Sequence, residues 1–206
     1  MLVLHYTGMQ SCAAAIERLC DPAAKVSSHY VVDEDGTIYR LVPEEQRAFH
    51  AGVSFWRGRR MLNDPSIGIE IVNPGHEWGY RPFPRAQMQA VRDLCLGILS
   101  RHAIPALNVV GHSDIAPNRK QDPGELFDWE GLAAEGIGLW PGDSCREARD
   151  VPGALASIGY DPDLPCQTNL TAFQRYWRQS AVDGIVDEQT RTRLAAVHDA
   201  LSKSDL

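Results

Sequence analysis

Three side chains of types that commonly bind transition metals stand out in this sequence. His112 begins an irregular segment, residues 111–124, that also carries Lys120 and Asp122, and His5 stands near the start of the chain. Zinc in hydrolases is usually held by three nitrogen, oxygen or sulfur ligands, and a fourth position is left to water. His5, His112 and Asp122 supply two imidazoles and one carboxylate, so we expect the zinc site of a mononuclear metallohydrolase.

A further candidate is a carboxylate inside an apolar segment. Residues 67–72 form a nearly continuous apolar run, as a central strand buried on both faces would, and Glu70 interrupts this run. An ionised carboxylate in a buried strand is costly unless it is paired, hydrogen-bonded or close to a metal. Glu70 therefore indicates a functional cavity at this strand.

The segments that must position these residues have recognisable patterns. Residues 2–6 are a short apolar run without helical period, which predicts a buried strand ending at a polar site, and residues 13–19 favour a helix. Residues 28–32 and 37–42 are rich in strand-forming residues and flank Gly36, whose positive φ suits a tight turn. We therefore expect a strand, a helix and a hairpin in this order.

The middle of the chain continues the alternation of strands and helices. Residues 49–65 are rich in glycine, arginine and aromatic residues and follow neither period, so we expect a surface loop that could line a cleft. Residues 84–102 predict an amphipathic helix, and residues 107–110 predict a strand. The order predicts an α/β fold, a mixed central β-sheet flanked by helices, with the candidate site residues at strand ends.

Composition limits the classes of partner. The chain of 206 residues carries a formal net charge of −7, its isoelectric point is near 5.5, and it has no run rich in lysine or arginine. These features argue against a nucleic acid or an anionic membrane surface as the main partner. No apolar run approaches the roughly 18 residues of a membrane span, and no signal-peptide core follows Met1. We expect either a cytoplasmic protein or a leader outside this sequence.

The five cysteines do not form a dense disulfide framework. They contain no CxxC pair, and their odd number leaves at least one unpaired within a chain. Cys12 and Cys20 would lie roughly 12 Å apart along a helix, too far for a disulfide. We expect free thiols, and a disulfide between Cys145 and Cys166 is the alternative.

Five short blocks stand in one order along the first 141 residues: Leu4–Thr7, Ser27–Tyr30, Trp56–Gly58, Ser66–Glu70 and Gly111–Gly124. In these blocks the chain resembles the type-2 N-acetylmuramoyl-L-alanine amidases. These zinc amidases share a fold with the phage lysozyme-type amidases and the animal peptidoglycan recognition proteins. They cut the bond between the lactyl group of muramic acid and the first L-alanine of the stem peptide.

The resemblance implies a role for each candidate. His5, His112 and Asp122 match the metal ligands of the family, Glu70 its catalytic carboxylate, and Lys120 the basic residue beside the scissile carbonyl. Zinc lowers the pKa of bound water, a carboxylate can move the protons, and a lysine can stabilise an oxyanion. The alternatives are an ion-pair role for Glu70 and a solvated loop position for Lys120.

Other residues are weaker candidates. His50, Trp56 and Arg57 could bind sugar or peptide in the substrate cleft, and the alternative for Trp56 and Arg57 is that they only pack the loop. We expect His29 in the core or behind the ligands.

A second, smaller part follows a change of composition near residue 141. Residues 154–160, 170–177 and 190–201 have helical patterns, and Asp183-Gly184 predicts a turn. About 60 residues in three short helices can form only a small core, so we expect this part to dock on the first.

The tail resembles the peptidoglycan-binding domain type 1 in three blocks: Ile158–Tyr160, Ala172–Arg175 and Asp183–Thr190. Asp187-Glu188 stands where that family often has Gly-Pro. We therefore divide the chain into a zinc amidase domain, residues 1–141, and a helical peptidoglycan-binding-like domain, residues 142–206. The alternative for the tail is a helical cap that stabilises the catalytic domain.

Together these observations predict a monomeric amidase with one zinc ion per chain that acts on peptidoglycan or muropeptides in wall turnover or recycling. The alternatives are a recognition protein that binds the same ligand without cutting it, and a phage-type lysin or antibacterial effector. The substrate favours the cell envelope or periplasm, whereas the missing leader and the unpaired cysteines favour the cytoplasm.

Overall fold

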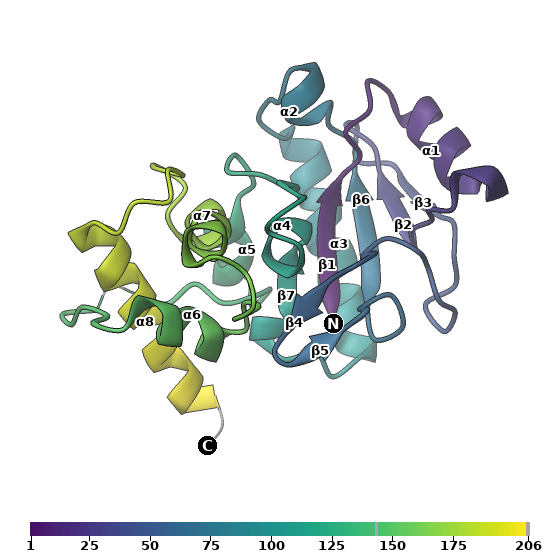
Figure 1. Cartoon of the computed structure of the whole chain (residues 1–206). Coiled ribbons are helices and arrows are strands. Elements are labelled where there is room, and N and C mark those ends of the chain that lie inside the picture. The colour runs from purple at the N-terminus through teal and green to yellow at the C-terminus, as the bar shows by residue number, and fades with distance from the viewer. Residues whose placement is uncertain (143, 205–206) are drawn as a thin grey trace.

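A five-stranded sheet forms the centre of the protein (Figure 1). The structure is a computed structural model, and it describes residues 1–142 and 144–204. In sheet order the strands are β3 (Ile38–Arg40), β2 (Tyr30–Val32), β6 (Ile67–Ile71), β1 (Leu2–Tyr6) and β7 (Val109–Gly111). Only β3 runs antiparallel to its neighbour; the other pairs are parallel. The predicted mixed sheet, including its hairpin, is confirmed.

The register of the parallel strands places the candidate residues at one edge of the sheet. In β1 and β6, His5 lies opposite Glu70, and Leu4 of β1 lies opposite Gly111 of β7. His112 follows Gly111 directly, so it comes level with His5. Because side chains opposite each other on paired strands share one face, His5 and Glu70 point to the same side of the sheet.

Helix α3 (Arg85–Arg101) covers one face of the sheet, and the hairpin of β4 (Phe55–Trp56) and β5 (Arg59–Arg60) covers the other (Figure 1). Val91, Cys95 and Ile98 of α3 are fully buried, and Gln87 of this helix donates from Nε2 to the carbonyls of Val32 and Val72, which lie at the ends of β2 and β6. The helix predicted at residues 84–102 is therefore confirmed. The shorter helices of this part are α1 (Cys12–Cys20), α2 (Gly75–Trp78), α4 (His112–Ile115) and α5 (Trp129–Ala134), with 3-10 turns at Pro22–Ala24 and Ala106–Asn108.

Two local predictions differ from the structure. The segment 49–65 is not a loop throughout, because it contains the β4–β5 hairpin. The two residues of its turn, Arg57 and Gly58, have φ of 49° and 78°, and an arginine rarely occupies the first such position. The strand predicted at residues 107–110 begins only at Val109, since a 3-10 turn takes the preceding residues.

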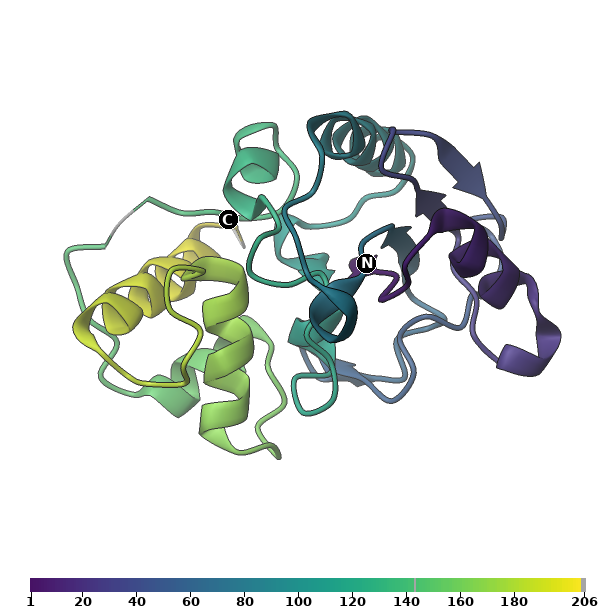
Figure 2. The same cartoon turned by 90° about the horizontal axis from the view of Figure 1, so that it is seen from above.

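The C-terminal part consists of three helices, as predicted: α6 (Val151–Ile158), α7 (Cys166–Trp177) and α8 (Glu188–Ser204). They gather beside the β7 edge of the sheet, at the end of the molecule opposite α1 (Figures 1 and 2). Gly159 ends α6.

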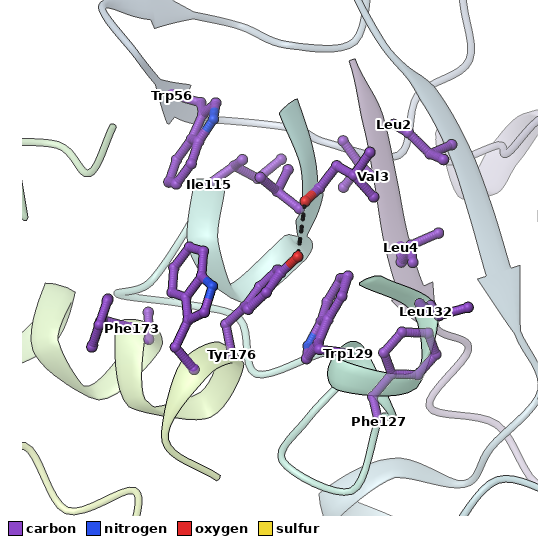
Figure 3. Close-up of a cluster of buried hydrophobic side chains, with 14 of the residues drawn as sticks. Leu2, Val3, Leu4, Trp56, Ile115, Phe127, Trp129, Leu132, Phe173 and Tyr176 are labelled. Atoms are coloured by element: carbon purple, nitrogen blue, oxygen red, sulfur yellow. Dashed lines mark hydrogen bonds between the residues drawn. The ribbon is translucent and has the colours of Figure 1, made fainter. Parts of the chain in front are cut away.

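The two parts share a continuous apolar core. Tyr176 of α7 stacks on Trp129 of α5 at a ring separation of 3.9 Å, and both belong to a buried cluster that extends to Leu2 in β1 (Figure 3). All five cysteines are free, so the Cys145–Cys166 disulfide is absent. Among the described residues no helix is long and apolar enough to cross a membrane.

Candidate metal centre and catalytic pocket

Three ligand atoms converge at the carboxyl edge of the sheet. His5 Nδ1 and His112 Nδ1 lie 2.9 Å apart, and each lies 3.0 Å from Asp122 Oδ2. All three side chains are buried. A tetrahedral zinc site with bonds of about 2.0–2.1 Å places ligand atoms about 3.3 Å apart, so small outward shifts would admit the ion. The predicted metal set is therefore brought together.

Hydrogen bonds behind the ligands leave the converging nitrogens free to bind a cation. His112 Nε2 donates to the carbonyl of Ala51 at 3.2 Å. His5 Nε2 donates to His50 Nδ1 at 3.0 Å, His50 Nε2 donates to Ser66 Oγ at 3.2 Å, and Ser66 donates to a backbone carbonyl. This pattern assigns the proton of both ligand imidazoles to Nε2, so that both Nδ1 atoms present lone pairs.

The charges of the ligands suit metal binding. Burial, helped by the charge of the neighbouring His112, lowers the pKa of His5 to about 4, so His5 is neutral at ordinary pH. Burial alone would raise the pKa of Asp122, but His112 and His5 hold it below its usual range through charge and hydrogen bonds. A neutral His5 imidazole and the Asp122 carboxylate are donors that zinc accepts.

Glu70 lies beside this centre without being part of it. Its Oε2 is buried and accepts no hydrogen bond from the described residues. Burial raises the pKa of Glu70 well above its usual range, the charge of Asp122 raises it further, and Lys120 opposes the shift. A carboxylate with a free oxygen in a pocket is suited to accept a proton from a bound molecule.

The centre opens into a pocket of about 420 Å³. Glu70 and Lys120 line it with the ligands His112 and Asp122, and Arg18 and Arg119 add positive charge to its wall. The Arg119 guanidinium also donates to the carbonyls of Ala51 and Val53, which fixes the loop that supports His112.

Hydrogen-bonded side chains that the sequence did not reveal lie along one rim of the pocket. The Tyr6 hydroxyl lies 2.9 Å from His76 Nδ1, and His76 Nε2 lies 3.2 Å from the carboxylate of Glu125. Tyr80 stacks on His76 at 4.3 Å. His76 lies at the surface and also lines the pocket. The hydrogen bonds of Tyr6, His76 and Glu125 join distant parts of the chain, so no local pattern links these three residues.

Two further histidines, His29 and His50, lie behind the centre. His29 is fully buried, as expected, and its Nδ1 accepts from the backbone of Gly68 at 3.0 Å. His50 touches the pocket, but it is only 7% exposed, and both its ring nitrogens are used by His5 and Ser66. His50 therefore supports His5 from behind and also touches the pocket, where a contact with substrate stays a prediction.

Trp56 and Arg57 are not brought to the pocket. Trp56 is 1% exposed, packs edge-on against Tyr160 at 5.1 Å, and donates from its indole nitrogen to Leu107. Arg57 donates its backbone N–H to the carbonyl of Gly159 at 2.9 Å. Both residues lie on the β4–β5 hairpin, toward the amino ends of the strands, and connect it to the C-terminal helices. Trp56 is therefore packed in the core, whereas Arg57 is exposed and lies outside this pocket.

Comparison with known proteins supports the expected amidase family. A family sequence model described as N-acetylmuramoyl-L-alanine amidase matches residues 1–125. The N-acetylmuramoyl-L-alanine amidase AmiD of Escherichia coli is 38% identical over 93% of this chain and 79% of its own length. The 1,6-anhydro-N-acetylmuramyl-L-alanine amidase AmpD of Escherichia coli is 41% identical over 51% of this chain and 55% of its own length.

Solved structures of two relatives match nearly the whole chain. AmiD from E. coli in complex with anhydro-N-acetylmuramic acid-L-Ala-D-γ-Glu-L-Lys superimposes with a TM-score of 0.85 at 37% identity, covering 97% of this chain and 88% of that one. AmpDh3 from Pseudomonas aeruginosa in complex with an anhydromuramic pentapeptide gives a TM-score of 0.88 at 35% identity, covering 98% and 91%.

Proposed function

Since the chain belongs to the N-acetylmuramoyl-L-alanine amidase family, we propose that it is a zinc enzyme that hydrolyses the amide bond between N-acetylmuramic acid and L-alanine. It is an amidase, and its substrates are peptidoglycan-derived muramyl peptides. The observation that carries the proposal is the convergence of His5, His112 and Asp122 beside Glu70, whose Oε2 has no hydrogen-bond partner in the described part of the chain.

His5, His112 and Asp122 hold the zinc ion in this proposal. Their three converging lone pairs fit a tetrahedral ion that keeps one position open to the pocket. When bound, zinc supplies a Lewis acid that lowers the pKa of a water molecule and polarises the amide carbonyl.

Glu70 and Lys120 move the proton and stabilise the charge. Glu70 takes a proton from the attacking water and delivers it to the leaving nitrogen of L-alanine, so the products are the free lactyl carboxylate and a free peptide amine. The ammonium group of Lys120 donates to the oxygen of the scissile carbonyl as negative charge develops there. Both side chains line the same pocket as the ligands, so no large movement is needed.

The charge of the pocket fits the stem peptide. A γ-linked glutamate leaves its α-carboxylate free, so a stem such as that in the AmiD complex carries negative charge. Arg18, Arg119 and Lys120 bring positive charge to the pocket wall. We therefore expect muramyl peptides, including anhydro forms, to bind with the stem along this wall.

We also propose that the two parts of the chain have different roles. Residues 1–141 carry the catalytic groups, and residues 142–206 form a helical unit that contacts peptidoglycan while it packs on the catalytic part. The substrate supports a place for the protein in the cell envelope, in the turnover and recycling of the wall.

The test uses anhydro-N-acetylmuramic acid-L-Ala-D-γ-Glu-L-Lys and mass analysis of the products. We expect anhydromuramic acid and free tripeptide with zinc, no cleavage after treatment with chelator, and recovery when zinc returns. Tight binding without cleavage under all three conditions would replace the proposal by a recognition protein. Cleavage at another bond would replace it by a different peptidase or glycosidase.

A further inference from the structure

A buried hydrogen bond links the C-terminal helices to the metal centre. Tyr160 follows α6, is fully buried, and donates from its hydroxyl to Asp114 Oδ1 at 2.7 Å. The other oxygen of Asp114 accepts the backbone N–H of Gly111 at 2.8 Å. Gly111 and Asp114 flank the ligand His112 in the sequence, so this carboxylate joins the ligand segment to the C-terminal part.

Helix α4, which carries His112 and Asp114, depends on such contacts for its position. It has only four residues, and a single helical turn is not stable alone in water. The backbone N–H of Ser113 in this helix donates to the carbonyl of Asp122 at 2.9 Å, so a shift of α4 moves two ligands together. Metal sites require their ligands to be held within about 0.5 Å of the productive geometry.

Tyr160 is itself held firmly by the catalytic part. Its ring packs edge-on against Trp56, and the neighbouring Gly159 accepts a backbone hydrogen bond from Arg57. Gly159 has a φ of 145°, and a Cβ there would lie 2.7 Å from the Arg57 side chain. Only glycine fits this close approach, so the hairpin and the end of α6 form one rigid support.

We propose that Tyr160 is a positioning residue: through Asp114 it holds the ligands His112 and Asp122 in the geometry that binds zinc. The C-terminal helices then help to hold the zinc ligands in position, in addition to any contact with peptidoglycan. The inference rests on the zinc site proposed above.

Tyr160→Phe tests this inference with little disturbance, because it keeps the ring and its contact with Trp56 and removes only the hydroxyl. Tyr176→Phe is the matched control. Tyr176 also lies in the buried contact between the two parts (Figure 3), and its hydroxyl donates to the carbonyl of Val109 at 3.4 Å rather than to Asp114. A purely structural role predicts the same behaviour for both variants.

The measurements are the zinc dissociation constant of the full chain, by competition with a chelating dye, and urea unfolding of the metal-free protein. Loss of an outer hydrogen bond at a metal site commonly weakens metal binding about 10–100-fold, so we expect about tenfold for Tyr160→Phe and no change for Tyr176→Phe. Both variants are expected to unfold at somewhat lower urea concentration.

Two results would overturn the inference: an unchanged zinc dissociation constant in Tyr160→Phe, or an equal weakening in both variants. A wild-type chain that binds no zinc would remove the proposed zinc site itself and this inference with it. The wild-type measurement therefore separates the two failures.

Discussion

Glu70→Gln separates proton transfer from metal binding. Glutamine keeps the shape of the side chain but cannot accept the proton of the attacking water. General acid–base catalysis contributes about 10²–10⁴-fold, and Glu70 takes part in two proton transfers, so we expect kcat to fall by about 10³–10⁴. This loss corresponds to about 4–5.5 kcal/mol of activation free energy.

Zinc binding should survive this change. Glu70 is not among the atoms that converge on the metal position, so the variant should still bind one zinc per chain. Steady-state release of tripeptide and the zinc content of the purified protein are the two assays. Turnover close to that of the wild type would refute the role of Glu70, and loss of zinc together with turnover would make it a ligand.

The same substitution should stabilise the metal-free protein. Burial raises the pKa of Glu70 well above that of the unfolded chain, near 4.5. Above that pH the folded state retains a proton that the unfolded state releases, so the wild type loses stability as pH rises. The loss is up to about 1.4 kcal/mol per pH unit until the folded pKa is reached. The advantage of the variant in urea unfolding should therefore grow from pH 5 to pH 8.

Glu44→Gln is the matched control. Glu44 is also a partly buried carboxylate, but hydrogen bonds, first from Arg101 and then from Tyr30 and His102, hold its pKa at about 2 despite burial. It does not line the pocket. This variant should lose stability at neutral pH and keep the wild-type kcat.

Three further substitutions near the metal centre and the pH dependence of stability give additional tests. Asp122→Ala should abolish zinc binding, so that added zinc no longer raises the melting temperature; an unchanged zinc content would assign the third ligand elsewhere. Lys120→Met should lower kcat about 10²–10³-fold with zinc retained, and a normal kcat would mean that another group stabilises the oxyanion. Gly68→Ala should weaken zinc binding and lower the melting temperature, because its Cβ would lie 2.5 Å from the ring of His50, which supports His5; unaltered zinc affinity would show that this support is unnecessary. Burial lowers the pKa of His5 to about 4 from about 6.5 in the unfolded chain, so the unfolded state binds the extra proton between these values. The metal-free protein should therefore lose stability as pH falls from 6.5 to 4, by up to about 1.4 kcal/mol per pH unit from this residue, and a flat profile in urea unfolding would contradict the low pKa.

The central strands and the long helix could be predicted because their signals are local. Residues 2–6 and 67–72 are apolar runs, and residues 84–102 repeat with helical period, whatever lies around them. The gathering of His5, His112 and Asp122 was predicted from ligand chemistry and family resemblance, and the register of β1, β6 and β7 is what brings it about.

The residues that support the centre could not be predicted in this way. Trp56 packs against Tyr160, about a hundred residues later, and nothing in the sequence near Trp56 says which surface covers it. The sequence did contain an indication of the close packing of His50. Gly68 interrupts a buried strand, and a glycine in such a strand often marks the close approach of another group. The ring of His50 occupies that space.

The most direct test of the account is a zinc titration of chelator-treated protein, with hydrolysis of the muramyl tripeptide measured at each addition. The account predicts negligible activity without zinc, a linear rise to one equivalent per chain and a plateau beyond it, and no such rise in Asp122→Ala. Full activity in the metal-free protein, or a rise that continues to two equivalents, would contradict a single catalytic zinc held by His5, His112 and Asp122.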